Sequence, residues 1–187
     1  MGRRPRSLVP GLYHLTVHGS DSRYLFLPGD REDFLARLSA TFERFEIAVL
    51  SYVLMGSHYH VLLRLPDARL SRALQWLHTE YSRLLNRRHR RSAHLFRAHP
   101  DVREITSDRH LIAAARYLAR NPVEAGIVTD PLDWQWSSAL AHAGFERFRI
   151  PLAESDLRAA FGGRDDWRRE YLVQIRTADE DTMPKAA

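Results

Sequence analysis

Two histidines separated by one residue, His58 and His60, form the most specific chemical feature of this 187-residue sequence. Residues 58–65 alternate between two faces, which predicts a β-strand in which residues i and i+2 point the same way. Two imidazoles on one face can bind one divalent ion, and Mg²⁺ or Mn²⁺ would need oxygen ligands in addition. On spacing alone, a solvated or hydrogen-bonded surface pair is the commoner arrangement.

Tyr117 and Asn121 are the second feature, because a separation of four residues places them on one face of a helix. A phenol can attack phosphorus, and an amide oxygen can coordinate a metal ion. Residue type alone favours a plainer interpretation, in which Tyr117 is an aromatic residue at the edge of the core and Asn121 is a helix C-cap. Spacing does not decide between these two interpretations.

The sequence contains no cysteine. This excludes a disulfide framework, a zinc-thiolate site, an iron-sulfur cluster and a thiol nucleophile. Any nucleophile must therefore be an oxygen or a nitrogen.

Positive charge is concentrated in the first two thirds of the chain. The whole sequence has a formal net charge of +5, whereas residues 1–120 carry 20 arginines against 11 acids, a net +9. One run without any acid predicts a track for a phosphate backbone, with Phe96 and nearby histidines available for base stacking. A solvated helix end plus loop explains the same run. Its arginines are Arg83, Arg87, Arg88, Arg90, Arg91 and Arg97.

The elements that must position these residues follow from periodicity. We expect strands at 12–18, 47–55, 58–65 and 102–105. Helices are expected from the N-cap Asp30 to Phe45, over 69–90, and from about 108, capped by Ser107, to 120, where Asn121-Pro122 interrupts the helix. This order predicts an α+β, ferredoxin-like antiparallel sheet backed by helices.

The length and the 44% hydrophobic content fit one domain plus an extension. We assign residues 1–144 to the domain and residues 145–187 to a helical extension that ends in a frayed acidic tail. No apolar run is long enough to span a membrane, and the basic start has no signal-peptide core. The expectation is a soluble protein of the bacterial cytoplasm that has no membrane partner.

Four motifs in order give the sequence a family resemblance. It resembles the single-tyrosine HUH transposases, and most of all the REP-associated tyrosine transposases, over about residues 9–143. His18, where that family usually has arginine, and Gly56-Ser57, where it has Pro-Asn or Pro-Glu, depart from the pattern. The matching segments are GLYHLT (11–16), YVLMGSHYHVLL (52–63), ARYLARNPVEAG (115–126) and DWQWSS (133–138).

The resemblance implies a role for each of the four candidate residues. His58 and His60 match the histidines that hold the divalent ion, Mg²⁺ or Mn²⁺, and Asn121 matches the polar residue that completes the metal site. Tyr117 matches the tyrosine that attacks the scissile phosphate, giving a 5'-phosphotyrosine link and a free 3'-OH. The implied fold is that of the HUH endonucleases, and the implied function is cleavage and transfer of single-stranded or hairpin DNA during transposition.

Two other functions remain open at this point. His14-Leu15-Thr16 supplies one His-x-Thr motif of a metal-independent phosphoesterase, but a second such motif is missing. A domesticated protein of the same fold could instead bind DNA hairpins without cleaving them. The sequence also leaves open whether the protein is a monomer or a homodimer.

Overall fold

Four strands form an antiparallel sheet in the order β2-β3-β1-β4. The computed structural model describes residues 8–20, 25–90, 92, 94–145 and 149–177. The strands are β1 (Gly11–His18), β2 (Ala48–Leu54), β3 (His58–Leu65) and β4 (Asp101–Ile105). Helix α1 (Asp30–Arg44) connects β1 to β2, and α2 (Leu70–Arg88) connects β3 to β4. This is the ferredoxin-like arrangement that the order of elements predicts.

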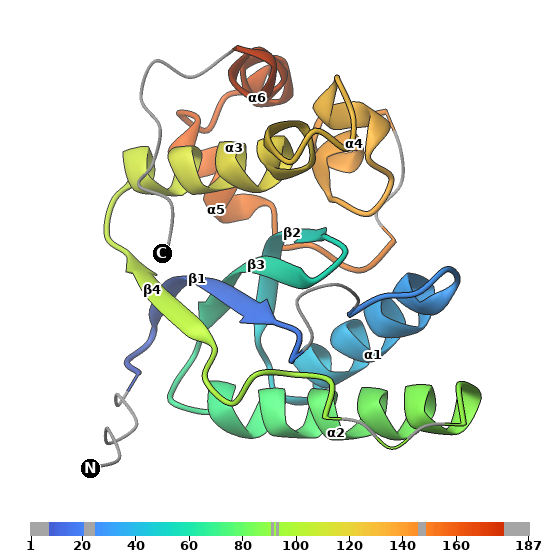
Figure 1. Ribbon diagram of the computed structural model, residues 1–187. Helices are drawn as coiled ribbons and strands as arrows, with labels where there is room; N and C mark the ends of the chain where they lie inside the picture. The colour runs from blue at the N-terminus through green and yellow to red at the C-terminus, as the bar shows by residue number, and fades with distance from the viewer. Residues whose placement is uncertain (1–7, 21–24, 91, 93, 146–148, 178–187) are drawn as a thin grey trace.

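Helices cover both faces of the sheet (Figure 1). Helices α1 and α2 lie side by side on one face, and α3 (Asp108–Glu124) lies on the other. The chain then continues through four short elements, of which α5 and α6 pack against α3. These elements are η1 (Pro131–Asp133), α4 (Ala139–His142), α5 (Ser155–Ala160) and α6 (Trp167–Arg176).

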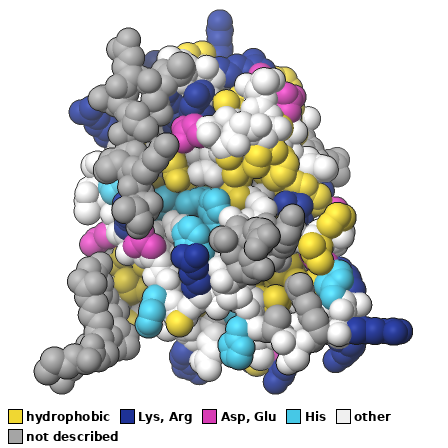
Figure 2. All heavy atoms as spheres, viewed as in Figure 1, with side chains coloured by type: hydrophobic (Ala, Val, Ile, Leu, Met, Phe, Trp, Pro, Cys, Tyr) yellow, Lys and Arg dark blue, Asp and Glu magenta, His cyan; other side chains and the backbone are white. Residues whose placement is uncertain are grey.

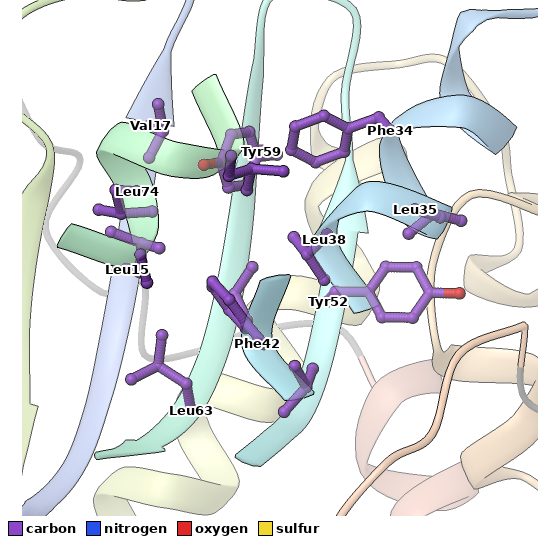
Figure 3. Packing of buried hydrophobic residues seen from close by; sticks show 14 of the residues in the cluster. Leu15, Val17, Phe34, Leu35, Leu38, Phe42, Tyr52, Tyr59, Leu63 and Leu74 are labelled. Atoms are coloured by element: carbon purple, nitrogen blue, oxygen red, sulfur yellow. The ribbon is translucent and has the colours of Figure 1, made fainter. Parts of the chain in front are cut away.

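The face under α1 and α2 is an apolar core, because alternate residues of β1 and β3 point into it. Phe34 of α1 is fully buried there, and its ring centre lies 4.8 Å from that of Tyr59. Figure 3 shows how the side chains of α1 pack against those of the strands. The residues that β1 and β3 place on this face include Tyr13, Leu15, Val17, Tyr59, Val61, Leu63 and Leu65, as the alternation predicts.

A second core forms between the sheet and α3. Leu62 of β3 and Leu118 of α3 are both completely buried in it. Trp167 and Tyr171 of α6 close the outer side of the same core. The helix that carries Tyr117 is therefore held from both sides.

The sequence predicts that this helix ends at residue 120, before Asn121-Pro122. In the structure α3 instead continues through Pro122 to Glu124. The proline has no N–H to donate, yet the last turn is closed because the Asn121 carbonyl accepts from the Ala125 N–H at 3.0 Å. Pro122 is also buried against the fold. Tertiary packing thus outweighs the steric preference of the residue before proline.

The start of α1 also differs from the prediction. Gly29 is the N-cap, with a positive φ of 83° that suits glycine, and Asp30 is the first helical residue. The Asp30 carboxylate is buried, accepts from the Leu27 N–H at 3.0 Å and pairs with Arg88. The Ser107 cap of α3 is confirmed, since its hydroxyl accepts from the His110 N–H.

The motif at residues 133–138 covers the outer edge of β2. The Leu54 N–H donates to the Trp136 carbonyl at 2.9 Å, and the Ser138 N–H donates to the Tyr52 carbonyl at 3.0 Å. The Trp134 indole donates to the Leu54 carbonyl, and the Ser138 hydroxyl contacts Ser51 Oγ at 2.8 Å. The two tryptophans and the serine therefore form hydrogen bonds with the edge strand β2 in this structure.

The C-terminal part of the chain includes the two helices α5 and α6. Because α5 and α6 pack on α3, they extend the second core. The division of the chain at residue 144 stays a prediction, and the acidic end at 179–181 lies outside the described residues. No helix within the described ranges is long and apolar enough to cross a membrane.

Candidate active site

The polar side chains of β1 and β3 share the face that α3 covers. The register places Thr16 opposite His60, and His18 opposite His58. The rings of His18 and His58 are stacked with centres 5.1 Å apart, and the His58 and His60 rings are perpendicular at 5.0 Å. Figure 2 shows histidine side chains gathered on the visible face of the molecule. The expected same-face pair is therefore present.

Tyr117 of α3 lies directly over these histidines. Its ring centre is 5.5 Å from that of His60 and 5.9 Å from that of His14. The Asn121 side chain, one turn further along, is close enough to His58 and Tyr117 to influence the pKa of each. Asn121 is thus not the helix C-cap, a position that Ala125 takes. Four residues from two distant parts of the chain meet at one place.

The two ring nitrogens of His60 have very different surroundings. Its Nδ1 lies 2.9 Å from Thr16 Oγ1 and 3.0 Å from His14 Nε2. Its Nε2 is buried and has no hydrogen-bond partner among the described residues. Buried polar atoms are rarely left unpaired, so this nitrogen marks a place where a ligand fits.

Burial controls the protonation of the site. It lowers the pKa of His14 and of His58 to about 4, and the charges of Arg103 and His18, respectively, act in the same direction. Burial also lowers the pKa of His60, with a further contribution from the neighbouring imidazoles. The imidazoles are therefore neutral at pH 7, which is the form that can donate a lone pair to a metal ion.

The Tyr117 hydroxyl is held in its neutral form. Burial raises its pKa, and the nearby Glu124 carboxylate raises it further. The hydrogen bond with Asn121 and the charge of Arg103 lower that pKa and so oppose the increase. A reaction that uses the phenolate needs additional positive charge near Tyr117.

The donor set suits a hard divalent ion that keeps several oxygen ligands. His58, His60 and the Asn121 amide oxygen could hold it, and water or phosphate oxygens would fill the other positions. Within the described ranges, no three His, Cys, Asp or Glu side chains are grouped as a metal site. A closed structural zinc site is therefore not formed by these described side chains.

Comparison with known proteins places the chain in a family. The family model described as "Transposase IS200 like" matches residues 10–120, more than half of the chain. The chain belongs to the IS200-like transposase family. His58, His60 and Tyr117 lie inside the matched region, and Asn121 follows it directly. A search of the curated proteins finds no match.

The fold of this transposase is shared with a solved structure. A REP-associated tyrosine transposase bound to a REP hairpin matches with a TM-score of 0.68 and 14% identity, over 82% of this chain and 93% of that chain. A candidate transposase from Deinococcus radiodurans matches with a TM-score of 0.45 and 11% identity, over 67% of this chain and 97% of that one. The resemblance seen in the sequence is confirmed, together with the fold class.

The structure of the transposase separates the arginine run from Tyr117. Helix α2 lies on the opposite face of the sheet, where Arg88 pairs with the carboxylates of Asp30 and Asp33. Arg83 pairs with Glu80. Arg87 and Arg90 are exposed near the end of α2, and Arg91 lies outside the described residues.

Arg97 is the described member of the run that lies beside the histidines of β1 and β3. The backbone N–H of Arg97 donates to the His18 carbonyl at 2.9 Å. Burial lowers the pKa of His18, and the charge of Arg97 lowers it further. Arg103 of β4 is paired in register with His14 and was missed by the sequence analysis. Only the pairing of β1 with β4 could have revealed it, because Arg103 lies 89 positions from its partner in the chain.

Proposed function

We propose that this transposase is a metal-dependent single-strand DNA endonuclease and strand transferase that acts on hairpin DNA through Tyr117. The observation that supports this most directly is the meeting of Tyr117 with His60, at 5.5 Å between ring centres, and with Asn121. A core tyrosine would not need two neutral histidines and an amide on the same face. We further propose Mg²⁺ or Mn²⁺ as the ion, held by His58, His60 and Asn121.

The chemistry assigned to Tyr117 is a transesterification. Its oxygen attacks phosphorus, the bond from phosphorus to the 3'-oxygen breaks, and the phenol proton passes through water to that oxygen. The products are a 5'-phosphotyrosine link and a free 3'-OH, so a second 3'-OH can reverse the reaction and join strands without a nucleotide cofactor.

Forming the phenolate is one free-energy cost that the site must reduce. A phenol of ordinary pKa near 10 needs about 4 kcal/mol to ionise at pH 7, and burial makes Tyr117 harder to ionise. Arg103 and Asn121 act in the opposite direction. A bound divalent ion would supply charge neutralisation and polarisation at the scissile phosphate.

The proposed DNA partner is single-stranded or contains a hairpin. The similar solved transposase is bound to a REP hairpin. Tyr117 is half-buried on a helix, so it cannot approach a phosphate inside a regular duplex without distortion of that duplex. We propose that Arg97 and Arg103, beside the site, contact the DNA backbone, and that exposed Arg87 and Arg90 extend this contact further from the site.

The decisive test compares two tyrosine-to-phenylalanine variants. Wild-type protein is incubated with Mg²⁺ or Mn²⁺ and hairpin oligonucleotides labelled at the 5' or 3' end, and covalent adducts are separated on a denaturing gel. Tyr117→Phe removes only the hydroxyl, so it abolishes cleavage and the adduct while hairpin binding persists. Tyr13→Phe is the matched control, since the Tyr13 hydroxyl bonds to the Val9 carbonyl outside the site.

Two results would contradict this proposal. An adduct that persists in Tyr117→Phe would place the nucleophile elsewhere. Wild-type protein that binds hairpins but forms no adduct with either ion would favour the alternative, a domesticated hairpin-binding protein of the same fold.

A further inference from the structure

Two residues of β1, Thr16 and His14, are neighbours of His60. Thr16 Oγ1 and His14 Nε2 both lie within hydrogen-bonding distance of His60 Nδ1, at 2.9 and 3.0 Å. Thr16 is directly opposite His60 in the strand register, so its position is set by the backbone of the sheet. His14 is buried, with only 8% of its surface exposed. Neither residue has a part in the chemistry described above.

Counting protons distinguishes the two neutral forms of His60. If the proton is on Nε2, then Nδ1 presents a single lone pair to two neighbours, and the Nε2–H is a buried donor with no acceptor among the described residues. Such an unmet donor destabilises a protein, because it loses its hydrogen bond to water and gains none in return. If the proton is on Nδ1, it can be shared between the Thr16 oxygen and the His14 nitrogen, and only a lone pair is left on Nε2.

We propose that Thr16 and His14 are positioning residues that hold His60 in its Nδ1–H form and thereby present the Nε2 lone pair to the divalent ion. The inference rests on the proposed function, because it assigns the buried nitrogen to that ion. It also requires His14 to carry its own proton on Nδ1, since its Nε2 must accept. Groups that orient a metal-binding histidine in this way commonly change metal affinity 10- to 100-fold.

Thr16→Val is the primary variant, because valine has nearly the same shape, favours strands and lacks the hydroxyl. Thr16→Ser restores a hydroxyl and is the rescue variant. Thr79→Val, at an exposed position of α2, is the matched control. The double variant Thr16→Val with His14→Phe removes both acceptors.

Two readouts separate positioning from a general loss of structure. In metal-free protein, two-bond ¹H–¹⁵N spectra identify the ring nitrogen of His60 that carries the proton, with His60→Gln used for assignment. Wild type and Thr16→Ser show the Nδ1–H form, whereas the double variant shifts to Nε2–H. Mn²⁺ affinity, measured from the free-ion EPR signal, falls about 10- to 100-fold in Thr16→Val and recovers in Thr16→Ser.

Three results would be decisive against one claim or the other. An Nε2–H form of His60 in the wild type overturns the inference. An unchanged tautomer and Mn²⁺ affinity in the double variant does the same. Wild-type protein with the Nδ1–H form that binds no Mn²⁺ refutes the proposed function but leaves the tautomer assignment in place, so the two failures are distinguishable.

Discussion

The two faces of the sheet use the same strands for opposite purposes. On the α1 and α2 face, β1 and β3 contribute aromatic and aliphatic side chains to the core, and the tyrosine hydroxyls are the polar groups of these side chains. On the α3 face, the alternate positions of those strands carry His14, Thr16, His18, His58 and His60. One face therefore stabilises the fold, and the other holds polar groups whose partners are incomplete.

This contrast shows how a small domain can accommodate a destabilising site. Neutral, buried imidazoles lose hydration, and His60 Nε2 gains no hydrogen bond in return among the described residues. The rigid apolar layer on the other side of β3 keeps the strand in place despite this loss. Variants on the two faces should consequently differ in whether they affect activity or stability.

The largest expected effect is on activity and comes from the site face. The double variant His58→Ala and His60→Ala should abolish cleavage, because it removes both nitrogen ligands of the proposed ion. Its free energy of unfolding should fall only modestly, because the cavity and the lost His60 hydrogen bonds are offset in part by the removal of two poorly solvated imidazoles. Cleavage assays and urea denaturation measure the two quantities, and retained cleavage would disprove the metal assignment.

The next effect is on stability and comes from the apolar face. Phe34→Ala should lower the free energy of unfolding by about 3–5 kcal/mol, the usual range for truncating a buried phenylalanine. The centre of the Phe34 ring lies 4.8–5.0 Å from the ring centres of Phe26, Tyr59 and Tyr81. Below the unfolding transition, the remaining folded protein should still form the DNA adduct. A loss smaller than 1 kcal/mol would mean that this face is less tightly packed than described.

A smaller effect should appear in the pH dependence of stability. Burial lowers the pKa of His78 to about 4, while its Nε2 contacts the Tyr59 hydroxyl at 2.9 Å. Below pH 6.5 the unfolded chain takes up a proton that the folded protein refuses, so stability falls between about pH 6.5 and 4. His78→Gln should reduce this dependence by the share of one histidine, and His14, His58 and His60, whose pKa values are also lowered, should supply the rest. An unchanged slope in urea denaturation across that range would show that His78 is charged when folded.

The smallest effect concerns DNA binding by single arginines. Arg97→Gln and Arg103→Gln should each reduce the slope of log affinity against log salt by about 0.7, the value for one phosphate contact on single-stranded DNA. Arg88→Gln should leave that slope unchanged, because Arg88 lies on the other face of the sheet and is engaged by buried Asp30 and by Asp33, whereas Asp101, the partner of Arg103, is exposed. A slope that falls for Arg88→Gln alone would move the DNA to the α2 face.

Much of the fold could be predicted because alternation in a strand is a local property. The faces of β1 and β3 and the extent of β3 could all be predicted from neighbouring residues. The C-terminal end of α3 could not be predicted in this way. Pro122 stays helical because of tertiary packing and the hydrogen bond from the Ala125 N–H, and local residue preferences include neither.

The candidate site was predictable for residues on one element and not for residues that meet across elements. His58 with His60, and Tyr117 with Asn121, follow from spacing within a strand or a helix. The roles now proposed for Thr16 and Arg103 depend on strand register, which spacing does not reveal. The arginine run was predicted from composition, which cannot tell that Arg88 turns to buried Asp30.

The edges of the sheet bear on self-association. The outer edge of β2 is occupied by bonds to Trp136 and Ser138 and by the Ala153 N–H, which donates to Val49 at 2.7 Å. The outer edge of β4 has no strand partner in the described part of the chain, and three charged residues, Asp101, Arg103 and Glu104, are exposed there. Exposed edge strands commonly drive aggregation, and charged side chains oppose it. Arg103 thus has two effects: its charge opposes edge-to-edge association of the sheet, and it also lowers the pKa of Tyr117.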